Sequence, residues 1–475
     1  MDKEPQKLVL FNTETRTKQP VIPQNGHTIM MYTCGPTVYN FAHIGNFRTY
    51  VFEDILRRTI KFFGMGINQV MNLTDIDDKT LKGAIENNTT LKDFTEPFIK
   101  SFFEDLDALG IERAEAYPAA TNYIDEMIKI IQQLVDNGVA YQGGEGSIYF
   151  SIKKFPKYGR LSHLKLDELE AGASDRIAAD DYDKEQVSDF VLWKAYDPER
   201  DGEIFWDSPF GKGRPGWHIE CSAMAMKILG QTIDIHVGGI DNMFPHHENE
   251  IAQCEACTGK TFVNHWLHSE HLLVDHKKMS KRLGNFYTLR DLLSKGFTGR
   301  EVRYSLLQTH YRMQLNFTFQ GLEAARNSLD RLDAFIRRVK DVKIEGIFSL
   351  VQPIIDRLQG AFASAMADDL NISVALASVF DAIREFNVLL DASKISSEDA
   401  CKIINVFKSL NSVLGVIIFE EEDFVPQDLQ EALESRQRAR AEKNWKEADH
   451  YRNYILSQGY EIDDTPSGAR LKKKR

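Results

Sequence analysis

The sequence predicts an α/β fold: a split, Rossmann-like parallel-sheet domain with an insertion, followed by an α-helical bundle and a small C-terminal module. Three observations predict it. Apolar runs of strand length flank a helical repeat near the N-terminus, similar runs return after residue 205, and helical periodicity dominates beyond residue 318. Because 475 residues are too many for one hydrophobic core, several domains are expected.

The first half of the split sheet is expected within residues 1–117. A mostly apolar run from Thr28 to Cys34 indicates a buried strand, helical spacing of apolar residues then continues to Gly64, and a second strand is indicated from Ile67 to Leu73. Parallel sheets bind ligands at the carboxyl ends of their strands, and helix N-termini attract phosphate. The residues expected to face one crevice are therefore Cys34, His43, Asn46 and Thr74.

Residues 118–205 are expected to form an insertion, because their pattern is helical at first and then mixed, with an acidic, turn-rich stretch from Glu168 to Asp183. The sheet pattern resumes at Thr232 to Val237, and a helix is expected from Pro245 to Gly259. We therefore predict the second half of the sheet within residues 206–270, meeting the first half at a shared cleft.

A loop region is expected at residues 271–317, and apolar stripes at helical spacing predict a bundle over residues 318–418. The acidic run Glu420 to Asp423 indicates a linker to a C-terminal module at residues 424–475. That module concentrates two groups of basic residues, Arg436, Arg438, Arg440, Lys443 and Lys446, and the final Lys472 to Arg475. They either face RNA or form a solvated helix face, and for Lys472 to Arg475 the sequence favours a solvated tail.

The composition limits the function classes. No apolar run reaches the ~20 residues that span a bilayer, and the N-terminus lacks the apolar core of a signal peptide, so we expect a cytoplasmic protein without membrane association. A net charge of −12 argues against a polyanionic partner on average, though not at a local basic patch. Five cysteines are few and odd in number, which argues against a disulfide framework and leaves thiols for metal binding or catalysis.

Two short stretches point to chemistry on ATP. His43-Ile44-Gly45-Asn46 offers an imidazole at a helix start, and Lys278-Met279-Ser280-Lys281-Arg282 offers loop ammonium groups. Each pattern alone occurs often by chance, and lysine-rich loops are usually solvated surface. Their pairing in one α/β unit favours a site that acts on the α-phosphate of ATP.

A metal site is indicated by His246 and Glu250, which stand four residues apart and share one face of the expected helix. Cys34 ends the first strand and Cys221 precedes the second half of the sheet, so both can reach the same crevice. Two thiolates, one imidazole and one carboxylate suit Zn²⁺. Spacing alone leaves Cys254 open as another ligand, although a CxxC within a helix is more often a pair of small core residues.

With these motifs together, the chain resembles the cysteinyl-tRNA synthetases of the class I aminoacyl-tRNA synthetase family over nearly its whole length. The resemblance implies one Zn²⁺ per chain, ATP with Mg²⁺, L-cysteine and tRNA(Cys) as ligands. The matching strings are Thr33 to Tyr39, His43 to Asn46, Asn72 to Lys79, Gly213 to Met224, Gly238 to Glu250, Lys278 to Asn285, Ala367 to Asn371 and Asp464 to Gly468.

The resemblance also implies roles for individual residues. It places Thr74 and Trp217 around the substrate cysteine, Asp241 at the ribose hydroxyls, and residues 271–317 and 424–475 at the acceptor stem and the anticodon side of the tRNA. The implied zinc ligands are Cys34, Cys221, His246 and Glu250. The implied groups at ATP and its phosphates are His43, Gly45, Asn46, Gly239, Asp241, Lys278 and Lys281, of which His43, Asn46, Lys278 and Lys281 are the catalytic candidates.

Four positions depart from the family pattern. Asn46 replaces the second His of the phosphate signature, which keeps a hydrogen-bond donor but removes a group that could carry charge. Arg282 replaces the usual Ser at the end of the loop and adds a cation near the phosphates. Phe210 and Leu471 stand where Trp is common, so a tRNA contact at the extreme C-terminus is less well supported.

The implied reaction is activation of L-cysteine by ATP and its transfer to the 3′ end of tRNA(Cys), with zinc selecting the thiol over the hydroxyl of serine. No hydrolytic site is evident in the insertion, so no editing is expected, and the protein is expected to be a monomer. Alternatives remain: a purely structural zinc, a ligase that joins cysteine to a small amine, or a non-catalytic synthetase-like RNA-binding protein.

Overall fold

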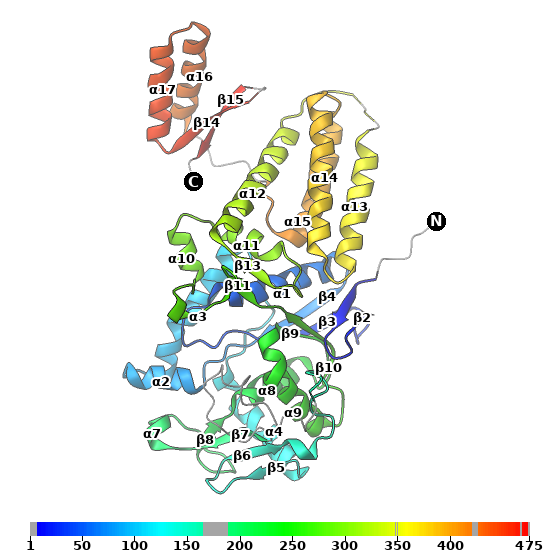
Figure 1. The fold of residues 1–475 in the computed structure, drawn as a ribbon, viewed down its shortest axis with the longest axis vertical. Helices are drawn as coiled ribbons and strands as arrows, with labels where there is room; N and C mark the ends of the chain where they lie inside the picture. The colour runs from blue at the N-terminus through cyan, green and yellow to red at the C-terminus, as the bar shows by residue number, and fades with distance from the viewer. Residues whose placement is uncertain are drawn as a thin grey trace. The chain divides into compact units, whose positions relative to one another are not determined.

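The computed structural model describes residues 7–164, 189–346, 348, 350–419, 426–465 and 468–473. The chain forms two compact units, Met1–Ile417 and Ile418–Arg475. The first unit is built on a four-stranded parallel sheet of order β10-β9-β3-β4 (Figure 1). Its strands are β3 (Thr28–Thr33), β4 (Gly66–Met71), β9 (Ile233–Gly239) and β10 (Val263–Ser269).

The two halves of this sheet meet where β3 pairs with β9, and the chain order reverses there. In such a sheet the crevice outside the carboxyl ends of the strands is the usual ligand site. Of the residues predicted at that crevice, Cys34 directly follows β3, Thr74 lies shortly after β4, and His43 and Asn46 lie at the start of α1. The predicted α/β class, with a sheet formed from two distant halves of the chain, is confirmed.

The helices α1 (Ile44–Phe62) and α8 (Trp217–Leu229) pack on the sheet, α1 against β4, β9 and β10 and α8 against β3 and β4. The helix expected from Pro245 begins later, at Glu248, and α9 runs over Glu248–Thr258. A wider π-type turn, η4 (Met243–His247), precedes it. Phe244 is extended there because a proline disfavours helical backbone at the residue before it. Gly259 ends α9 in the left-handed region, as predicted.

The insertion packs onto the second half of the sheet. Its helix α4 (Ile124–Asp136) contacts α8 and α9, and their apolar faces share one core with the insertion's antiparallel sheet. That sheet has the order β5-β6-β7-β8 and extends to Gly213–Pro215, beyond residue 205. Its other strands are β5 (Ala140–Gln142), β6 (Ile148–Ser151) and β7 (Asp189–Ala195), and short helices are η1 (Ala120–Tyr123), η2 (Ile152–Lys154) and α7 (Pro198–Asp201). The acidic stretch Glu168 to Asp183 lies outside the described residues.

Smaller elements border the carboxyl ends of the parallel strands. A three-stranded sheet of order β12-β11-β13 carries the lysine-rich loop, and its strands are β11 (Leu272–Val274), β12 (Lys277–Lys278) and β13 (Leu315–Phe317). The remaining elements of this part are β1 (Val9–Asn12), β2 (Thr17–Pro20), α2 (Asp78–Glu86), α3 (Leu91–Ala108), η3 (Ile240–Asn242), η5 (Lys281–Leu283), α10 (Leu289–Ser294) and α11 (Gly299–Leu307).

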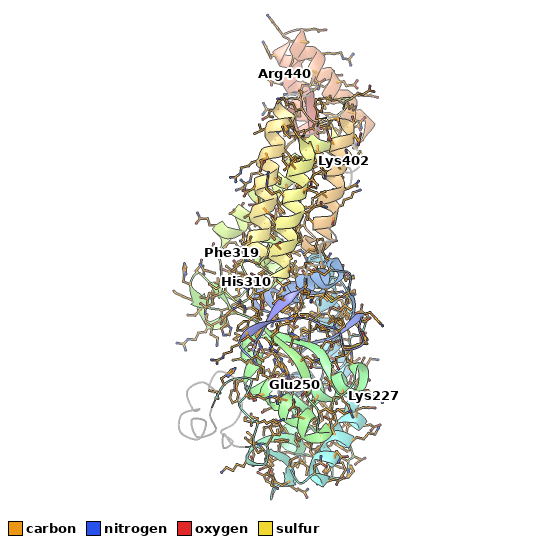
Figure 2. The ribbon with its side chains drawn as sticks, turned by 90° about the vertical axis from the view of Figure 1, so that its right-hand side faces the viewer. Lys227, Glu250, His310, Phe319, Lys402 and Arg440 are labelled. Carbon is orange, nitrogen blue, oxygen red and sulfur yellow. The ribbon has the colours of Figure 1, made fainter. Side chains whose placement is uncertain are left out.

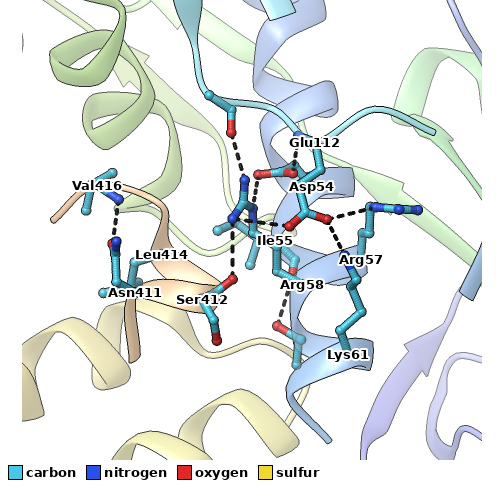
Figure 3. Close-up of polar contacts among 12 residues, drawn as sticks. Asp54, Ile55, Arg57, Arg58, Lys61, Glu112, Asn411, Ser412, Leu414 and Val416 are labelled. Carbon is cyan, nitrogen blue, oxygen red and sulfur yellow. Dashed lines mark hydrogen bonds and ion pairs between the residues drawn. The ribbon is translucent and has the colours of Figure 1, made fainter. Parts of the chain in front are cut away.

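The predicted helical bundle consists of α12 (Phe319–Lys340), α13 (Val351–Ala367), α14 (Ile372–Asp391) and α15 (Ser397–Leu414). In Figure 2, Lys402 lies on this bundle and Glu250 in the α/β part. A polar network ties the end of α15 to α1: Arg58 donates to the Ser412 carbonyl (Figure 3). Buried Arg303 donates to the Leu414 carbonyl and to Asp54. The bundle is thereby attached to the helix that starts at the predicted phosphate signature.

The C-terminal unit contains α16 (Gln427–Ala441), α17 (Trp445–Ser457) and a hairpin of β14 (Tyr460–Thr465) and β15 (Gly468–Lys473). Its core is formed by Leu429, Ala432, Ile455 and Tyr460, with Leu471 packed against it. The sequence patterns did not predict the hairpin, and the expected linker Glu420 to Asp423 lies outside the described residues. Within the described part of the chain, no helix combines the length and apolar character needed to cross a membrane.

Candidate active site and metal centre

Four buried side chains gather below the carboxyl ends of β3 and β9: Cys34, Cys221, His246 and Glu250. One donor atom from each lies within 4.8 Å of the donors of the other three. Around a tetrahedral Zn²⁺, bond lengths of 2.0–2.3 Å require donors about 3.3–3.8 Å apart. The donor set and its spacing therefore fit one zinc ion after small adjustments.

Neighbouring aromatic rings orient the imidazole and carboxylate donors. The His246 ring stacks on Trp217 with centroids 4.1 Å apart, and its Nδ1 lies 2.9 Å from Nδ1 of His218. His236 Nε2 donates to Glu250 Oε2 at 2.9 Å, and His246 Nε2 lies 3.0 Å from Glu250 Oε1. Such contacts behind a ligand fix its orientation and its basicity.

Binding of a cation would change the protonation states of this cluster. Burial opposes ionisation of Glu250, but the imidazoles of His236 and His246 lower the pKa of Glu250 to about 2. Hydrogen bonding to Cys34, together with burial, raises the pKa of the Cys221 thiol well above its ordinary value. Without a cation, Cys221 is thus a buried neutral thiol. A divalent ion would reverse this, because coordination deprotonates a thiol.

A second donor set overlaps the first, and it combines Cys34 and Glu250 with His236 and His247. His247 Nε2 lies 3.2 Å from Cys34 Sγ, and its Nδ1 lies 2.8 Å from His268 Nε2. Since the two sets share two residues, they describe alternative positions for one ion. The first set has two thiolates, the ligands that Zn²⁺ prefers in sulfur-rich sites.

Sequence patterns did not predict these neighbouring histidines. The feature that could have indicated His236 and His268 is an ionisable residue within an apolar run of strand length. His236 interrupts the buried strand β9, and His268 lies near the end of β10. The alternative ligand Cys254 belongs to neither of the two donor sets found among the described residues. Its thiol is fully buried and hydrogen-bonded to Ser222, and burial raises its pKa well above the ordinary value.

The phosphate signature lies at the N-terminus of α1, where His43 is the N-cap. Its Nδ1 accepts from the Asn46 backbone N–H at 3.2 Å, and Asn46 Oδ1 accepts from the His43 backbone N–H at 3.0 Å. This reciprocal pair is a capping box. Because Nδ1 and Oδ1 act as acceptors, the donors that the two side chains can present are the His43 Nε2–H and the Asn46 amide. The Asn46 departure thus preserves both the cap and a donor.

The lysine-rich loop meets this helix start. An added Cβ on Gly45 would lie 2.9 Å from the His43 ring and 3.1 Å from Met279 Cε, so any larger residue would require both side chains to shift. Ile44 N donates to the Tyr287 carbonyl at 3.0 Å, and the His43 ring contacts Phe286. Lys278 is exposed on β12, and the Lys281 side chain lies outside what the structure describes. The two motifs that sequence analysis paired are therefore neighbours.

The residues expected around cysteine and ribose lie on both sides of the sheet crossover. Buried Thr74 accepts from Asn72 Nδ2 at 2.9 Å, and its carbonyl accepts from Val38 N at 3.0 Å. Gly239 ends β9, and an added Cβ there would lie 2.4 Å from Asp241 Oδ1. Trp217 stacks on His246, which brings this predicted substrate residue into direct contact with the metal cluster.

Two of the departures from the family pattern fill apolar space. Phe210 packs edge-on against Trp193 with centroids 6.4 Å apart, and Leu471 packs on the core of the C-terminal unit. Arg282 is exposed in the loop. Leu471 therefore supports the module's own core.

Comparison with known proteins decides the family. A model described as the catalytic domain of class I (C) tRNA synthetases matches residues 20–327, and one described as a DALR domain matches residues 361–419. A cysteine–tRNA ligase of Protochlamydia amoebophila is 61% identical over 468 residues, covering 98% of each chain. One from Chlamydia felis is 55% identical over 473 residues, with the same coverage of 98%. The chain belongs to the cysteine–tRNA ligase family.

The fold has solved neighbours among synthetases. Mycobacterium tuberculosis methionyl-tRNA synthetase, solved in complex with methionyl-adenylate, aligns with a TM-score of 0.60 at 12% identity. The alignment covers 82% of this chain and 90% of the other. Such a likeness concerns the fold, and it agrees with the class I architecture of the family.

Proposed function

We propose that this protein activates L-cysteine with ATP to cysteinyl-adenylate and transfers the cysteinyl group to the 3′ end of tRNA(Cys). The observation that carries the proposal is the meeting of two sites at one sheet crossover: a buried Cys, Cys, His and Glu cluster and a helix N-terminus approached by the lysine-rich loop. The first site suits a thiol-containing substrate, and the second suits the phosphates of ATP with its Mg²⁺.

In the activation step, the cysteine carboxylate attacks the α-phosphate and pyrophosphate leaves. This chemistry needs positioned donors more than a protein nucleophile. We assign the donor roles to the His43 Nε2–H, the Asn46 amide and the ammonium groups of Lys278 and Lys281, with Gly45 admitting the loop and Gly239 and Asp241 at the ribose. Each well-placed donor of this kind contributes about 3–4 kcal/mol to lowering the barrier.

For the substrate side chain, we assign Thr74 and Trp217 as neighbours and Cys34, Cys221, His246 and Glu250 as ligands of one Zn²⁺. When bound, the ion would favour a thiolate over a neutral hydroxyl, whereas shape alone separates such near-isosteres only ~100-fold. Trp217 supports this assignment because its ring contacts the His246 ligand. The same residues would otherwise form a purely structural zinc site.

The wider organisation follows from the same proposal. Residues 1–117 and 206–270 would form the catalytic domain, 118–205 the insertion, 271–317 the signature loop and stem contact, 318–418 the bundle, and 424–475 the anticodon-side module. We further propose a cytoplasmic monomer.

The test is cysteine-dependent ATP–pyrophosphate exchange followed by tRNA cysteinylation, using zinc-loaded protein and serine as the competitor. We expect exchange with cysteine, a discrimination against serine well above ~100-fold, and a product that depends on tRNA. Absence of exchange would indicate a non-catalytic RNA-binding protein. Exchange without tRNA-dependent product would indicate a small-molecule acceptor, and comparable rates with serine would refute the role of zinc.

A further inference from the structure

Two aromatic side chains are exposed on the segment that joins the metal cluster to the phosphate signature. Tyr39 is 38% exposed and Phe41 is 41% exposed, although both lie between Cys34 and His43 in the chain. The neighbouring Val38 is buried and donates its N–H to the Thr74 carbonyl. The two exposed rings therefore lie on the chain segment that leads from Cys34 to His43. We propose that Tyr39 and Phe41, here named the aromatic platform, stack the unpaired bases at the 3′ end of the tRNA as it enters the crevice.

Each ring of the platform is accompanied by a cation from a different helix. The Lys79 ammonium, on the first turn of α2, lies 5.3 Å from the Tyr39 ring centroid. The Arg290 guanidinium, on α10, lies 5.1 Å from the Phe41 ring centroid. Rings beside cations are the combination that binds single-stranded nucleic acid, because bases stack on the rings while the cations attract the phosphates.

The acidic groups near these cations are themselves paired. Asp78, next to Lys79, forms ion pairs with Arg214 and Lys194, so it does not cancel the Lys79 charge. Arg290 pairs through its edge with Glu104 and donates to Ser101, which holds its plane over Phe41. Asp77 also lies near Lys79, and Arg290 has Asp105 at 3.7 Å besides Glu104, so the exposed rings and the cations over them, not a net positive charge, define the platform.

Aromatic side chains of α3 hold the Phe41 ring of the platform in place. Phe41 packs edge-on against Phe98 at 5.4 Å, and Phe98 packs edge-on against Phe94 at 5.5 Å. An added Cβ on Gly83 would lie 2.1 Å from Phe94, so α2 and α3 are closely packed at this point. A rigid ring loses little conformational entropy when a base stacks on it, which favours a role in binding over an exposed side chain without one.

This inference rests on the proposed function and assigns residues to the step after activation. It is tested by measuring the binding of tRNA(Cys) transcripts with and without the unpaired 3′ nucleotides to wild-type protein and to Tyr39→Leu and Phe41→Leu. We expect each substitution to weaken binding of the intact transcript by about 5- to 150-fold, the range for one stacked base, and to leave binding of the truncated transcript unchanged.

Controls separate stacking from general damage. Tyr39→Phe keeps the ring and should restore binding of the intact transcript, and Tyr141→Leu removes an equally exposed tyrosine, 42% exposed, from the insertion sheet without effect. Equal weakening of both transcripts, or of neither, would overturn the proposal, as would a wild-type protein that binds no tRNA. If wild-type protein cysteinylates tRNA, yet the substituted proteins still bind the intact transcript as wild type does, the platform is refuted and the proposed function stands. A wild type without cysteine-dependent exchange refutes the proposed function itself.

Discussion

Replacing Asp54 with Asn should destabilise the larger unit strongly, because Asp54, which also pairs with Arg58 on its own helix (Figure 3), is the buried carboxylate that joins α1 to Arg303 on α11. Its side chain is 0% exposed and that of Arg303 is 1% exposed. Arg303 Nη2 donates to Asp54 Oδ2 at 2.5 Å, Arg58 Nε donates to the same oxygen at 2.7 Å, and the Glu112 backbone N–H donates to Oδ1 at 2.9 Å. Every contact of the carboxylate is therefore with a donor.

The magnitude follows from burial. Asp54→Asn leaves the Arg303 guanidinium buried without its carboxylate and turns an amide N–H₂ toward another donor. Breaking a buried pair in this way costs about 3–5 kcal/mol. Since about 1 kcal/mol shifts the melting temperature of a large domain by roughly 2–4 °C, we expect a decrease of roughly 6–20 °C.

The assay is calorimetric or denaturant unfolding of the full chain, following the transition of the larger unit. Glu398→Gln is the matched control, since its partner Lys402 lies 2.8 Å away but the two side chains are 64% and 44% exposed. An exposed pair contributes roughly 0–1 kcal/mol, so this variant should unfold like wild type. If Asp54→Asn costs less than about 1 kcal/mol, the argument that this network attaches the bundle through buried charge is wrong.

Three further predictions concern single positions. Glu53 is 1% exposed and, among the described residues, neither carboxylate oxygen has a hydrogen-bond partner, so burial raises the pKa of Glu53 well above its ordinary value. Because Glu53 ionises more readily in the unfolded chain, the free energy of unfolding decreases as pH rises above about 4.5. Glu53→Met should therefore stabilise the protein by about 1–3 kcal/mol at pH 8 and by less at pH 5, and equal effects at both pH values would contradict this. His43→Ala should slow pyrophosphate exchange about 100- to 1,000-fold while costing only about 1 kcal/mol of stability as a lost N-cap, and an unchanged exchange rate would remove His43 from the mechanism. Gly45→Ala adds a Cβ 2.9 Å from the His43 ring and 3.1 Å from Met279 Cε, so we expect the KM for ATP in exchange to rise at least about 10-fold with an unchanged melting temperature. Wild-type kinetics would show that neither His43 nor the loop needs the space at Gly45.

The sequence predicted β3, β4 and β9 because these strands are mostly apolar runs whose ends are marked by Gly, Pro or polar residues. It did not predict β10 (Val263–Ser269), whose apolar residues are interrupted by Asn264, His265 and His268. The run predicted at Thr28 to Cys34 is the strand Thr28–Thr33, and Gly259 ends α9 as expected. Patterns of this kind report burial along one element. They do not report the hairpin at Tyr460–Thr465 and Gly468–Lys473, whose apolar content is low and whose pairing is set by packing on α16 and α17.

At the candidate site, spacing could bring together only residues on one helix. His246 and Glu250 were paired by their separation of four, although His246 lies in a π-type turn and not in the helix. Cys34 and Cys221 come from elements far apart in the chain; their places beside the expected strands indicated that both could reach the crevice, and the resemblance decided against Cys254. His236, His247 and His268 lie on three different elements, so only tertiary packing brings them together around the cluster.

The most direct test of the central claim is the zinc content of purified wild-type, Cys221→Ser and His247→Gln proteins, measured after equilibration with a competing chelator. We expect one zinc per wild-type chain, loss of zinc from Cys221→Ser, and retention by His247→Gln, because Cys221 belongs to the first donor set and His247 to the second. Retention of zinc by Cys221→Ser together with loss from His247→Gln would contradict it.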